Sequence, residues 1–379
     1  MTRREFLEMS ACAGACAAMP SAVKAAGGQD GIKAMLLHLG MNMWCDYLPE
    51  DMDNAILASK TSGRGVPDTV LRNKDDLWRK ATDRMAEKGL NMLVIDLGEG
   101  LVYPSHPELA IEGSWSPDKL KDEIARLKKL GIEAIPKMNF STTHNGWLKH
   151  YHRMVSTAPY YRVCEDLIRD VGEIFSTPRF LHIGCDEEYA QHMMNDGYHR
   201  SITVRLGELW EHDFLHLVKN CEKNGMRAWA WSDYSWNHPD FLRRCPKSVL
   251  MSNWYYDERL GGFEISDYKA KEHRERLQNF YDLEKAGFEQ VPCATNWSGS
   301  ARRAKKCGAD DVIGKTVRLC RRDIPAARLK GFMMAPWRSC DTPENLAFNL
   351  KGIDLFADAL EGRIAPNPEG PVDRAESGS

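Results

Sequence analysis

The sequence predicts an α/β protein whose single domain is a (β/α)8 TIM barrel, a closed ring of parallel strands surrounded by helices. Short apolar runs alternate with amphipathic helical patterns eight times along the chain. Such alternation predicts parallel strands joined by right-handed crossovers, and eight units in roughly 330 residues is the size that this barrel requires. No predicted strand is followed by a G-x-G-x-x-G turn, so an open doubly wound sheet is the weaker alternative.

The first four strands are predicted at residues 34–39, 91–97, 132–138 and 180–183. Helices are predicted between them at residues 75–88, 116–130 and 161–175. Ser116, Pro117 and Asp118 form a typical helix start, because they supply an N-cap, a first-turn proline and a first-turn acid. The long polar and aromatic stretch at residues 139–160 is predicted to be an exit loop that covers a site.

The last four strands are predicted at residues 227–231, 249–253, 290–295 and 331–335. A strongly amphipathic helix is predicted at residues 205–224, and a closing helix at residues 343–360. The barrel domain is therefore expected to span residues 31–363, with a flexible tail rich in Pro, Gly and Ser at residues 364–379.

The N-terminus indicates export. Residues 2–7 read T-R-R-E-F-L, which resembles the twin-arginine export motif, and small residues with possible cleavage sites follow. Residues 1–28 are therefore expected to be a signal peptide, and the mature protein is expected to be periplasmic or secreted.

Composition narrows the possible partners. The chain has 379 residues, of which 43% are hydrophobic and 28% are charged, and its net charge is −3. This balance gives no indication of nucleic acid as a partner, and no run of about 20 apolar residues predicts a membrane span. The 11 cysteines include no C-x-x-C pair, so buried free thiols are expected.

The strongest functional signal follows the fourth strand. Residues 179–188 read R-F-L-H-I-G-C-D-E-E, so Asp186, Glu187 and Glu188 lie at the strand's carboxyl end. Barrels place their chemistry at this end, and adjacent acids in different environments can serve as a proton donor and an anion. The alternative is an acidic loop that opens the next helix, whose N-terminus favours negative charge.

Tryptophans also gather at the predicted strand ends. Five of the 11 lie at or just beyond the ends of strands one, five, six, seven and eight: Trp44, Trp231, Trp254, Trp297 and Trp337. Polar residues at the same exits include Asp233, Tyr255 and Arg338. A rim of indoles with polar groups suits a carbohydrate, because the C–H face of a sugar packs on aromatic rings.

A metal site is the competing interpretation of the polar residues. Acids together with His144, His182 and Asn139 could hold a divalent cation, as in sugar isomerases. However, the chain has no H-x-x-E-H or E-x-x-H pair at these exits, so neither a metal nor a cofactor is expected.

Residues 182–187, which read H-I-G-C-D-E, resemble the H-x-G-G-D-E motif of the family 20 glycoside hydrolases, the β-N-acetylhexosaminidases. The likeness extends upstream to residues 103–109, reading Y-P-S-H-P-E-L, and to residues 131–136 with the loop that reaches His144. It covers roughly residues 90–190, with the order and spacing of the motifs preserved.

The resemblance implies a (β/α)8 barrel that hydrolyses N-acetylhexosaminides with retention, assisted by the substrate's own acetamido group. By motif position, Glu187 would be the general acid and Asp186 would hold the acetamido group. His144 would hydrogen-bond this pair, and Glu188 would be a helix-start acid.

The sequence departs from the family pattern at several positions. The family's Glu-x-Asp after strand three is Lys137, Met138 and Asn139 here, and the second glycine of the main motif is Cys185. The arginine expected after strand one has no counterpart in residues 41–46. Three alternatives therefore stay open: a glycosidase for a different or modified sugar, a non-catalytic carbohydrate-binding barrel, and a metal-dependent sugar isomerase.

Overall fold

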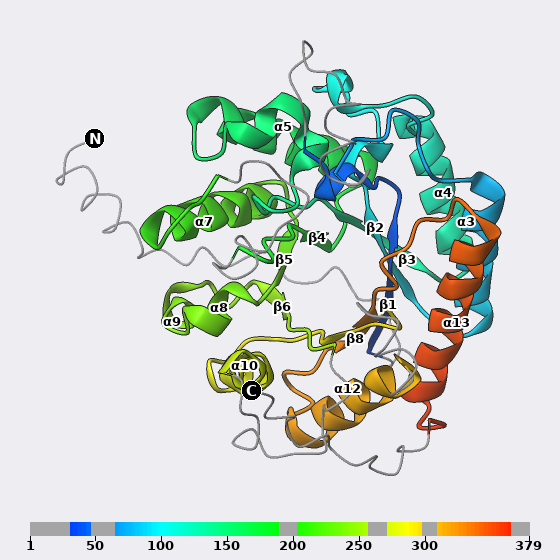
Figure 1. The fold of residues 1–379 in the computed structure, drawn as a ribbon, viewed down its shortest axis with the longest axis vertical. Coiled ribbons are helices and arrows are strands. Elements are labelled where there is room, and N and C mark those ends of the chain that lie inside the picture. Colours follow the sequence, from blue (N-terminus) through cyan, green and yellow to red (C-terminus); the bar gives the residue numbers. More distant parts are fainter. Residues whose placement is uncertain (1–30, 47–64, 189–202, 257–270, 298–308, 365–379) are drawn as a thin grey trace, which may run out of the picture. The chain divides into compact units, whose positions relative to one another are not determined.

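The computed structural model describes residues 31–46, 65–188, 203–256, 271–297 and 309–364. Its eight strands are parallel and follow the order β6-β5-β4-β3-β2-β1-β8-β7 (Figure 1). They are β1 (Ile32–His38), β2 (Met92–Asp96), β3 (Glu133–Lys137), β4 (Phe180–His182), β5 (Arg227–Trp231), β6 (Leu250–Ser252), β7 (Cys293–Ala294) and β8 (Gly331–Met334). The expected signal peptide and nearly all of the expected tail lie outside the described residues.

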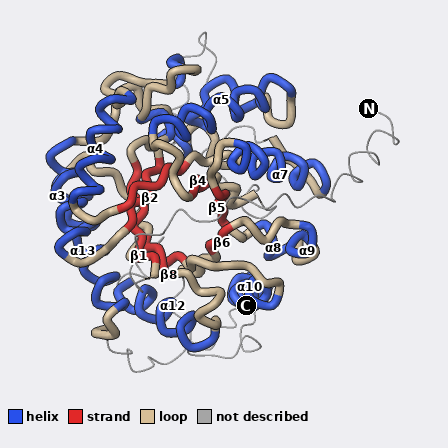
Figure 2. The backbone as a smooth tube through the Cα atoms, turned by 180° about the vertical axis from the view of Figure 1, so that it is seen from behind, coloured by secondary structure: helices blue, strands red, loops and turns tan. Residues whose placement is uncertain are grey.

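The sheet closes between β6 and β7. The N–H of Val291 donates to the carbonyl oxygen of Met251 at 2.9 Å, and that of Cys293 donates to Asn253 at 2.9 Å. Parallel bridges also join Met251 to Gln290 and Trp254 to Cys293. Figure 2 shows the resulting ring of strands inside a layer of helices. The predicted (β/α)8 barrel is therefore confirmed.

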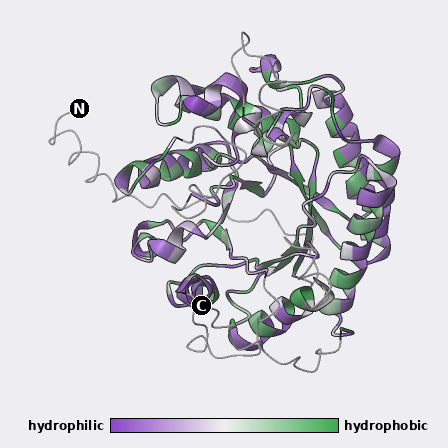
Figure 3. Ribbon diagram, viewed as in Figure 1, coloured by the Kyte–Doolittle hydropathy of each residue, from purple (hydrophilic) through white to green (hydrophobic). Residues whose placement is uncertain are grey.

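The longer helices of the described residues surround the ring: α3 (Asp75–Glu87), α4 (Pro117–Lys129), α5 (Ala158–Ile174), α7 (Glu208–Lys223), α10 (Lys271–Lys285), α12 (Ala309–Asp323) and α13 (Pro343–Leu360). Short elements after the strands are η1 (Asn42–Trp44), η2 (Gly98–Gly100), η3 (Pro107–Leu109), η4 (Gly146–Arg153), α8 (Tyr234–Asn237) and α9 (Phe241–Arg244). The Ser116 side chain caps α4 as predicted, by accepting a hydrogen bond from the N–H of Lys119. Hydrophobic residues lie mainly along the strands and the facing sides of the helices (Figure 3).

Alternation along the strands divides the core in two. One set of side chains packs outward against the helices, and the other fills the barrel. The interior set comprises Ala34, Leu36, Met92, Val94, Ile135, Phe180, Trp229, Trp231, Trp236, Leu250, Trp254, Val291, Cys293, Met333 and Ala335. Because side chains alternate in this way, every second residue at the end of each strand faces the barrel axis.

A polar layer crosses the barrel interior at the ends of β1 to β4. His38, Asp96, Lys137 and His182 are register partners in neighbouring strands, and all four are buried. Lys137 Nζ lies 2.6 Å from Asp96 Oδ2, and His38 Nδ1 lies 3.2 Å from the same oxygen. Burial alone would raise the pKa of Asp96, but these two partners lower it to about 2. The layer therefore holds a buried ion pair at the depth where the strands end.

Two predictions from composition concern the cysteines and membrane spans. The eight described cysteines are free and buried, as expected: Cys45, Cys164, Cys185, Cys221, Cys245, Cys293, Cys320 and Cys340. Among the helices of the described residues, none is long and apolar enough to cross a membrane.

Candidate active site

The acidic pair, Asp186 and Glu187, lies in a tightly wound exit from β4. Gly184 has φ +70°, and a Cβ there would overlap the side chain of Asn139, so only glycine fits. Cys185 and Glu187 also have positive φ values, 67° and 59°. Left-handed backbone at non-glycine residues is strained and is concentrated at functional sites, where surrounding contacts maintain it.

The exit loop of β3 holds Asp186 in place. Asn139 Nδ2 donates to Asp186 Oδ1 at 2.8 Å. The hydroxyl groups of Ser141 and Thr143 both donate to the main-chain oxygen of Asp186, the latter at 3.2 Å. The polar stretch predicted to cover a site therefore fixes both the backbone and the carboxylate of this acid.

His144 lies against both acids. Its Nε2 is 3.2 Å from Glu187 Oε2, and its Nδ1 is 3.9 Å from Asp186 Oδ1 and 2.9 Å from the Thr143 hydroxyl. Burial alone would lower the pKa of His144, but Asp186 and Glu187 raise it to about 9. At neutral pH the site therefore contains an imidazolium beside two carboxyl groups.

Asp233 supports the pair from β5. Its Oδ2 accepts the main-chain N–H of Glu187 at 2.5 Å, and its Oδ1 is buried without a partner within the described residues. Burial, together with the charges of Asp186 and Glu187, raises the pKa of Asp233 well above its ordinary value. The Asp233 carboxyl group therefore anchors the backbone of Glu187, and its raised pKa favours the neutral form.

Aromatic side chains lie beside the acids. Five of them form an aromatic wall: Trp44, Trp231, Trp254, Tyr256 and Trp337. The Trp337 ring lies 6.0 Å from that of Trp231 and 6.3 Å from that of Trp44. Trp44 in turn packs edge-on to His144 at 6.0 Å, and Trp254 lies 5.0 Å from Tyr256. The structure thus brings Trp231, Trp254 and Trp337 into one cluster, and their role in substrate binding stays a prediction.

Three predicted site residues do not join this group. Tyr255 packs outward and its hydroxyl contacts His273 Nδ1 at 2.9 Å, because strand alternation turns Tyr256 inward instead. Arg338 is exposed and lies over the Phe348 ring of α13 at 5.4 Å. Trp297 is partly exposed, and its ring contacts none of the wall's rings within the described part of the chain. The structure therefore places Tyr255, Arg338 and Trp297 apart from the aromatic wall, and their roles in substrate binding stay predictions.

Sequence reasoning missed several supporting residues. The sequence indicated Asn139 only as a possible metal ligand. It gave no indication that Ser141 and Thr143 would hold Asp186, beyond their place in a long exit loop. Glu188 was expected to open a helix, but the following residues lie outside the described ranges. Its side chain is buried and pairs with Arg205, which also pairs with Asp213 at 3.1 Å.

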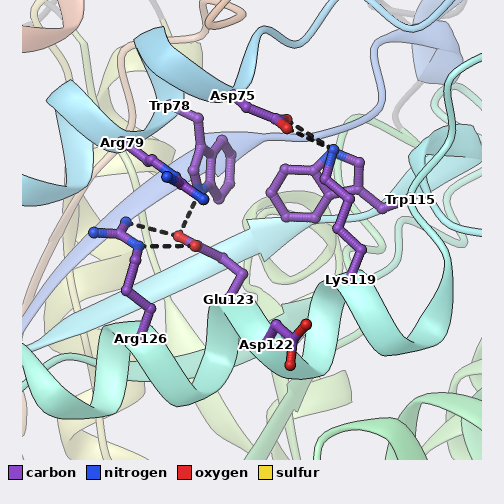
Figure 4. Close-up of a pocket in the computed structure, with 8 residues that line it drawn as sticks. All are labelled: Asp75, Trp78, Arg79, Trp115, Lys119, Asp122, Glu123 and Arg126. Carbon is purple, nitrogen blue, oxygen red and sulfur yellow. Dashed lines mark hydrogen bonds and ion pairs between the residues drawn. The ribbon is translucent and has the colours of Figure 1, made fainter.

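No group of three His, Cys, Asp or Glu side chains that could hold a metal ion occurs among the described residues. A small surface pocket lies between α3 and α4, outside the barrel (Figure 4). Four of its charged groups form two ion pairs: Lys119 with Asp75 at 2.7 Å, and Arg126 with Glu123 at 2.8 Å. The β4 exit therefore remains the candidate active site.

Comparisons with known proteins concern the fold. No protein-family model and no curated protein matches the chain. A GH20 exo-β-N-acetylglucosaminidase from Vibrio harveyi is 14% identical to this chain and superposes with a TM-score of 0.55. The match covers 87% of this chain and 54% of the Vibrio chain. A β-N-acetylhexosaminidase from Bacteroides fragilis is 12% identical with a TM-score of 0.51, covering 85% and 65%.

A mutant Streptomyces plicatus β-hexosaminidase in complex with the product GlcNAc is 12% identical with a TM-score of 0.52, covering 86% of this chain and 63% of that one. The chain thus spans between about half and two thirds of the length of these three structures. At such low identity the likeness establishes the fold alone. The chain has the (β/α)8 barrel fold of the GH20 β-N-acetylhexosaminidases, as the resemblance in its sequence predicted.

Proposed function

We propose that the protein is a glycoside hydrolase that cleaves terminal N-acetylhexosamine from glycans by a retaining, substrate-assisted mechanism. The observation that carries the proposal is the contact of His144 with both Asp186 and Glu187 at the carboxyl ends of the barrel strands. The barrel fold of GH20 enzymes and the matching order of the H-x-G-x-D-E motif support it.

Each acid has a separate role in this mechanism. Glu187, whose side chain is 23% exposed, donates its proton to the glycosidic oxygen as the bond from C1 to that oxygen breaks. Asp186, 11% exposed, accepts the substrate's amide N–H and orients the acetamido carbonyl oxygen. That oxygen attacks C1 to form a cyclic oxazolinium ion, whose charge Asp186 stabilises.

The second half of the reaction restores the enzyme. Glu187, now a carboxylate, removes a proton from the attacking water, and the water oxygen bonds to C1 as the ring opens. Two inversions at C1 give net retention. His144 offsets the negative charge that the two acids share in this state, because its cation lies beside both.

The aromatic wall supplies the apolar side of the site. Trp337 is partly exposed, and its ring packs against the buried Trp231 and against Trp44, which contacts His144. Exposed indole surface of this kind packs on the C–H face of a sugar. A carbohydrate therefore fits the combination of indoles and carboxyl groups better than a purely apolar or purely charged ligand does.

The direct test is turnover of aryl glycosides of N-acetylglucosamine, N-acetylgalactosamine and glucose. We expect turnover of an N-acetyl sugar but not of the glucoside, since glucose has no acetamido group. Glu187→Gln is expected to lower kcat by at least about 100-fold, the contribution of a general acid. Glu112→Gln, on an exposed side chain outside the site, is the matched control and should retain full activity.

The other outcomes discriminate between the alternatives. Equal turnover of the glucoside would contradict assistance by the acetamido group, and Asp186→Asn would then not be selectively impaired on N-acetyl substrates. Binding of sugars with no turnover would indicate a carbohydrate-binding barrel. Inactivation by a chelator would indicate a metal-dependent enzyme.

The proposal includes export by the twin-arginine route, supported by the T-R-R-E-F-L sequence at residues 2–7. Replacing both Arg3 and Arg4 with lysine preserves charge but removes the motif. We expect the double variant to stay in the cytoplasm of the producing cell, while the parent chain appears in the periplasm or medium. Equal distribution of the two would contradict the proposed signal.

A further inference from the structure

The turn that leaves β1 is held by a buried carboxyl group from β2. The main-chain N–H groups of Met41 and Asn42 both donate to Glu99 Oε1, at 2.6 and 3.0 Å. Glu99 lies in η2, directly after β2, and is 2% exposed. One oxygen that accepts two main-chain N–H groups fixes the backbone at the start of η1.

Glycines allow this contact by bringing the backbones together. A Cβ at Gly40 would lie 2.7 Å from the carbonyl oxygen of Leu97 and 2.8 Å from Glu99 Oε2. A Cβ at Gly100 would lie 2.9 Å from the nitrogen of Gly40, and one at Gly146 would overlap the carbonyl oxygen of Cys45. The β1 turn therefore packs against both the β2 exit and η4, with no space for side chains between them.

The same turn carries Trp44. Its partly exposed ring lies 5.3 Å from His38, 6.0 Å from His144 and 6.3 Å from Trp337. Asn42, also in η1, joins the turn to Asp68 by two hydrogen bonds. Its Nδ2 donates to the Asp68 carbonyl oxygen at 2.9 Å, and its Oδ1 accepts the Asp68 N–H at 2.8 Å. The position of the Trp44 ring beside His144 thus depends on the hydrogen bonds that Glu99 accepts.

We propose that Glu99 is a positioning residue of the candidate active site and that Trp44, which it orients, is a specificity-determining residue for the bound sugar. This inference rests on the proposed glycosidase function. Recognition at the β1 exit then depends on contact between the indole and the C–H face of the sugar. The indole of Trp44 would then recognise the sugar at the strand exit where the family pattern has an arginine, which has no counterpart in residues 41–46.

The effect of Glu99 on sugar binding should depend on pH, because its surroundings shift its pKa. Burial raises the pKa of Glu99 to about 7, against the opposing effect of the main-chain N–H groups and with a further rise from Asp96. Within the described residues, Cys45 on the turn, Tyr103 after β2 and Lys149 on η4 also interact electrostatically with Glu99. Above pH 7 the carboxylate is the stronger acceptor, so sugar binding through Trp44 should weaken as pH falls through 7.

The test compares Glu99→Gln with the parent chain and with Glu112→Gln, the same change at an exposed acid. We expect Glu99→Gln to raise KM, and the Kd for free N-acetylglucosamine measured by calorimetry, about tenfold at pH 8, with kcat within about twofold. Its Kd should be nearly constant between pH 6 and 8, whereas the parent and control should bind more weakly at pH 6. Trp44→Ala should weaken sugar binding by a similar factor, and Trp44→Phe should bind the sugar nearly as tightly as the parent chain.

A purely structural role for Glu99 gives a different pattern. A folded Glu99→Gln protein with unchanged KM and an unchanged pH profile, or one with lowered kcat alone, would overturn the proposal. If the parent chain neither binds nor hydrolyses N-acetyl sugars, the proposed function and the role of Trp44 in specificity both fail. The positioning role of Glu99 is then decided by a crystal structure of Glu99→Gln, and an unmoved β1 turn and Trp44 ring would refute it.

Discussion

His144 is the residue whose charge most directly affects the acidic pair. It is buried, yet Asp186 and Glu187 keep it protonated well above the ordinary range for histidine. An imidazolium in this place reduces repulsion between two carboxyl groups that must sit close together. It also lies within hydrogen-bonding distance of only one of them, Glu187, at 3.2 Å. The two adjacent acids are therefore electrostatically distinct, as acid and base roles require.

Replacing His144 with glutamine should destabilise the protein in a pH-dependent way. Since folding raises its pKa from 6.5 to about 9, the stabilisation is fully present below pH 6.5 and is lost as pH rises through 9. We expect a loss of about 3 kcal/mol at pH 6, at about 1.4 kcal/mol per pKa unit, and little loss at pH 10. Urea unfolding of parent and variant at both pH values measures this. An equal loss at both values would contradict it.

Asp233 illustrates a different use of a buried carboxyl group. Burial and the charges of Asp186 and Glu187 raise its pKa well above the usual range, which favours the neutral form, and one of its oxygens accepts the N–H of Glu187. Asp233→Asn keeps a neutral acceptor, so we expect its free energy of unfolding at pH 7 to stay within about 1 kcal/mol of the parent. Asp233→Leu removes the acceptor and should cost about 1–3 kcal/mol. Urea unfolding of both variants tests this, and similar losses in the two would argue that Asp233 acts as an anion.

At the scale of elements, the exit from β4 depends on one glycine. Gly184 and Gly131 both have positive φ, +70° and +77°, but only Gly184 has neighbours within 4 Å of an added Cβ. Gly131→Ala should therefore cost about 1–2 kcal/mol from left-handed strain alone. Gly184→Ala adds an overlap with Asn139, which holds Asp186, so we expect a larger drop in Tm together with lower turnover. Equal Tm shifts in the two variants would contradict this account.

The helices and strands themselves were largely predictable. The strand β5 and the helix α13 have the predicted bounds, because an apolar strand bounded by loop residues and a proline-initiated helix are local signals. The main deviation is β7, predicted at residues 290–295 and observed as Cys293–Ala294. Pro292 has no N–H to donate, so the hydrogen-bonded ladder is interrupted and Gln290 keeps only isolated bridges, to Met251 and to Leu329.

At the scale of the molecule, closure of the barrel buries every described thiol. The eight free cysteines come from strands, exits and helices, and all are buried. We therefore expect these eight to react with a thiol reagent only after unfolding, and Tm to be the same with and without a reductant. Thiol counting on native and denatured protein, paired with thermal melting, provides the measurement. A reductant-sensitive Tm would show that a disulfide supports the fold.

The sequence by itself determined the fold class, most element bounds and the place of the two adjacent acids at the exit from β4. These follow from periodicity, capping and a short motif, all of which are properties of neighbouring residues. The same local reasoning placed Tyr255 and Arg338 in the site, since both follow strands that end at the correct face. It had no means of choosing between Tyr255 and Tyr256, because their direction depends on how the strand joins the ring.

Only the tertiary structure decided which distant groups meet. The contacts of His144 with Glu187, of Asp233 with the Glu187 backbone, and of Glu99 with the β1 turn each join separate exits of the barrel. Their geometry is fixed by closure of the ring, which brings the ends of all eight strands to one face. Burial and charge at that face then set protonation, since a pKa depends on the surrounding dielectric and charges and not on sequence neighbours alone.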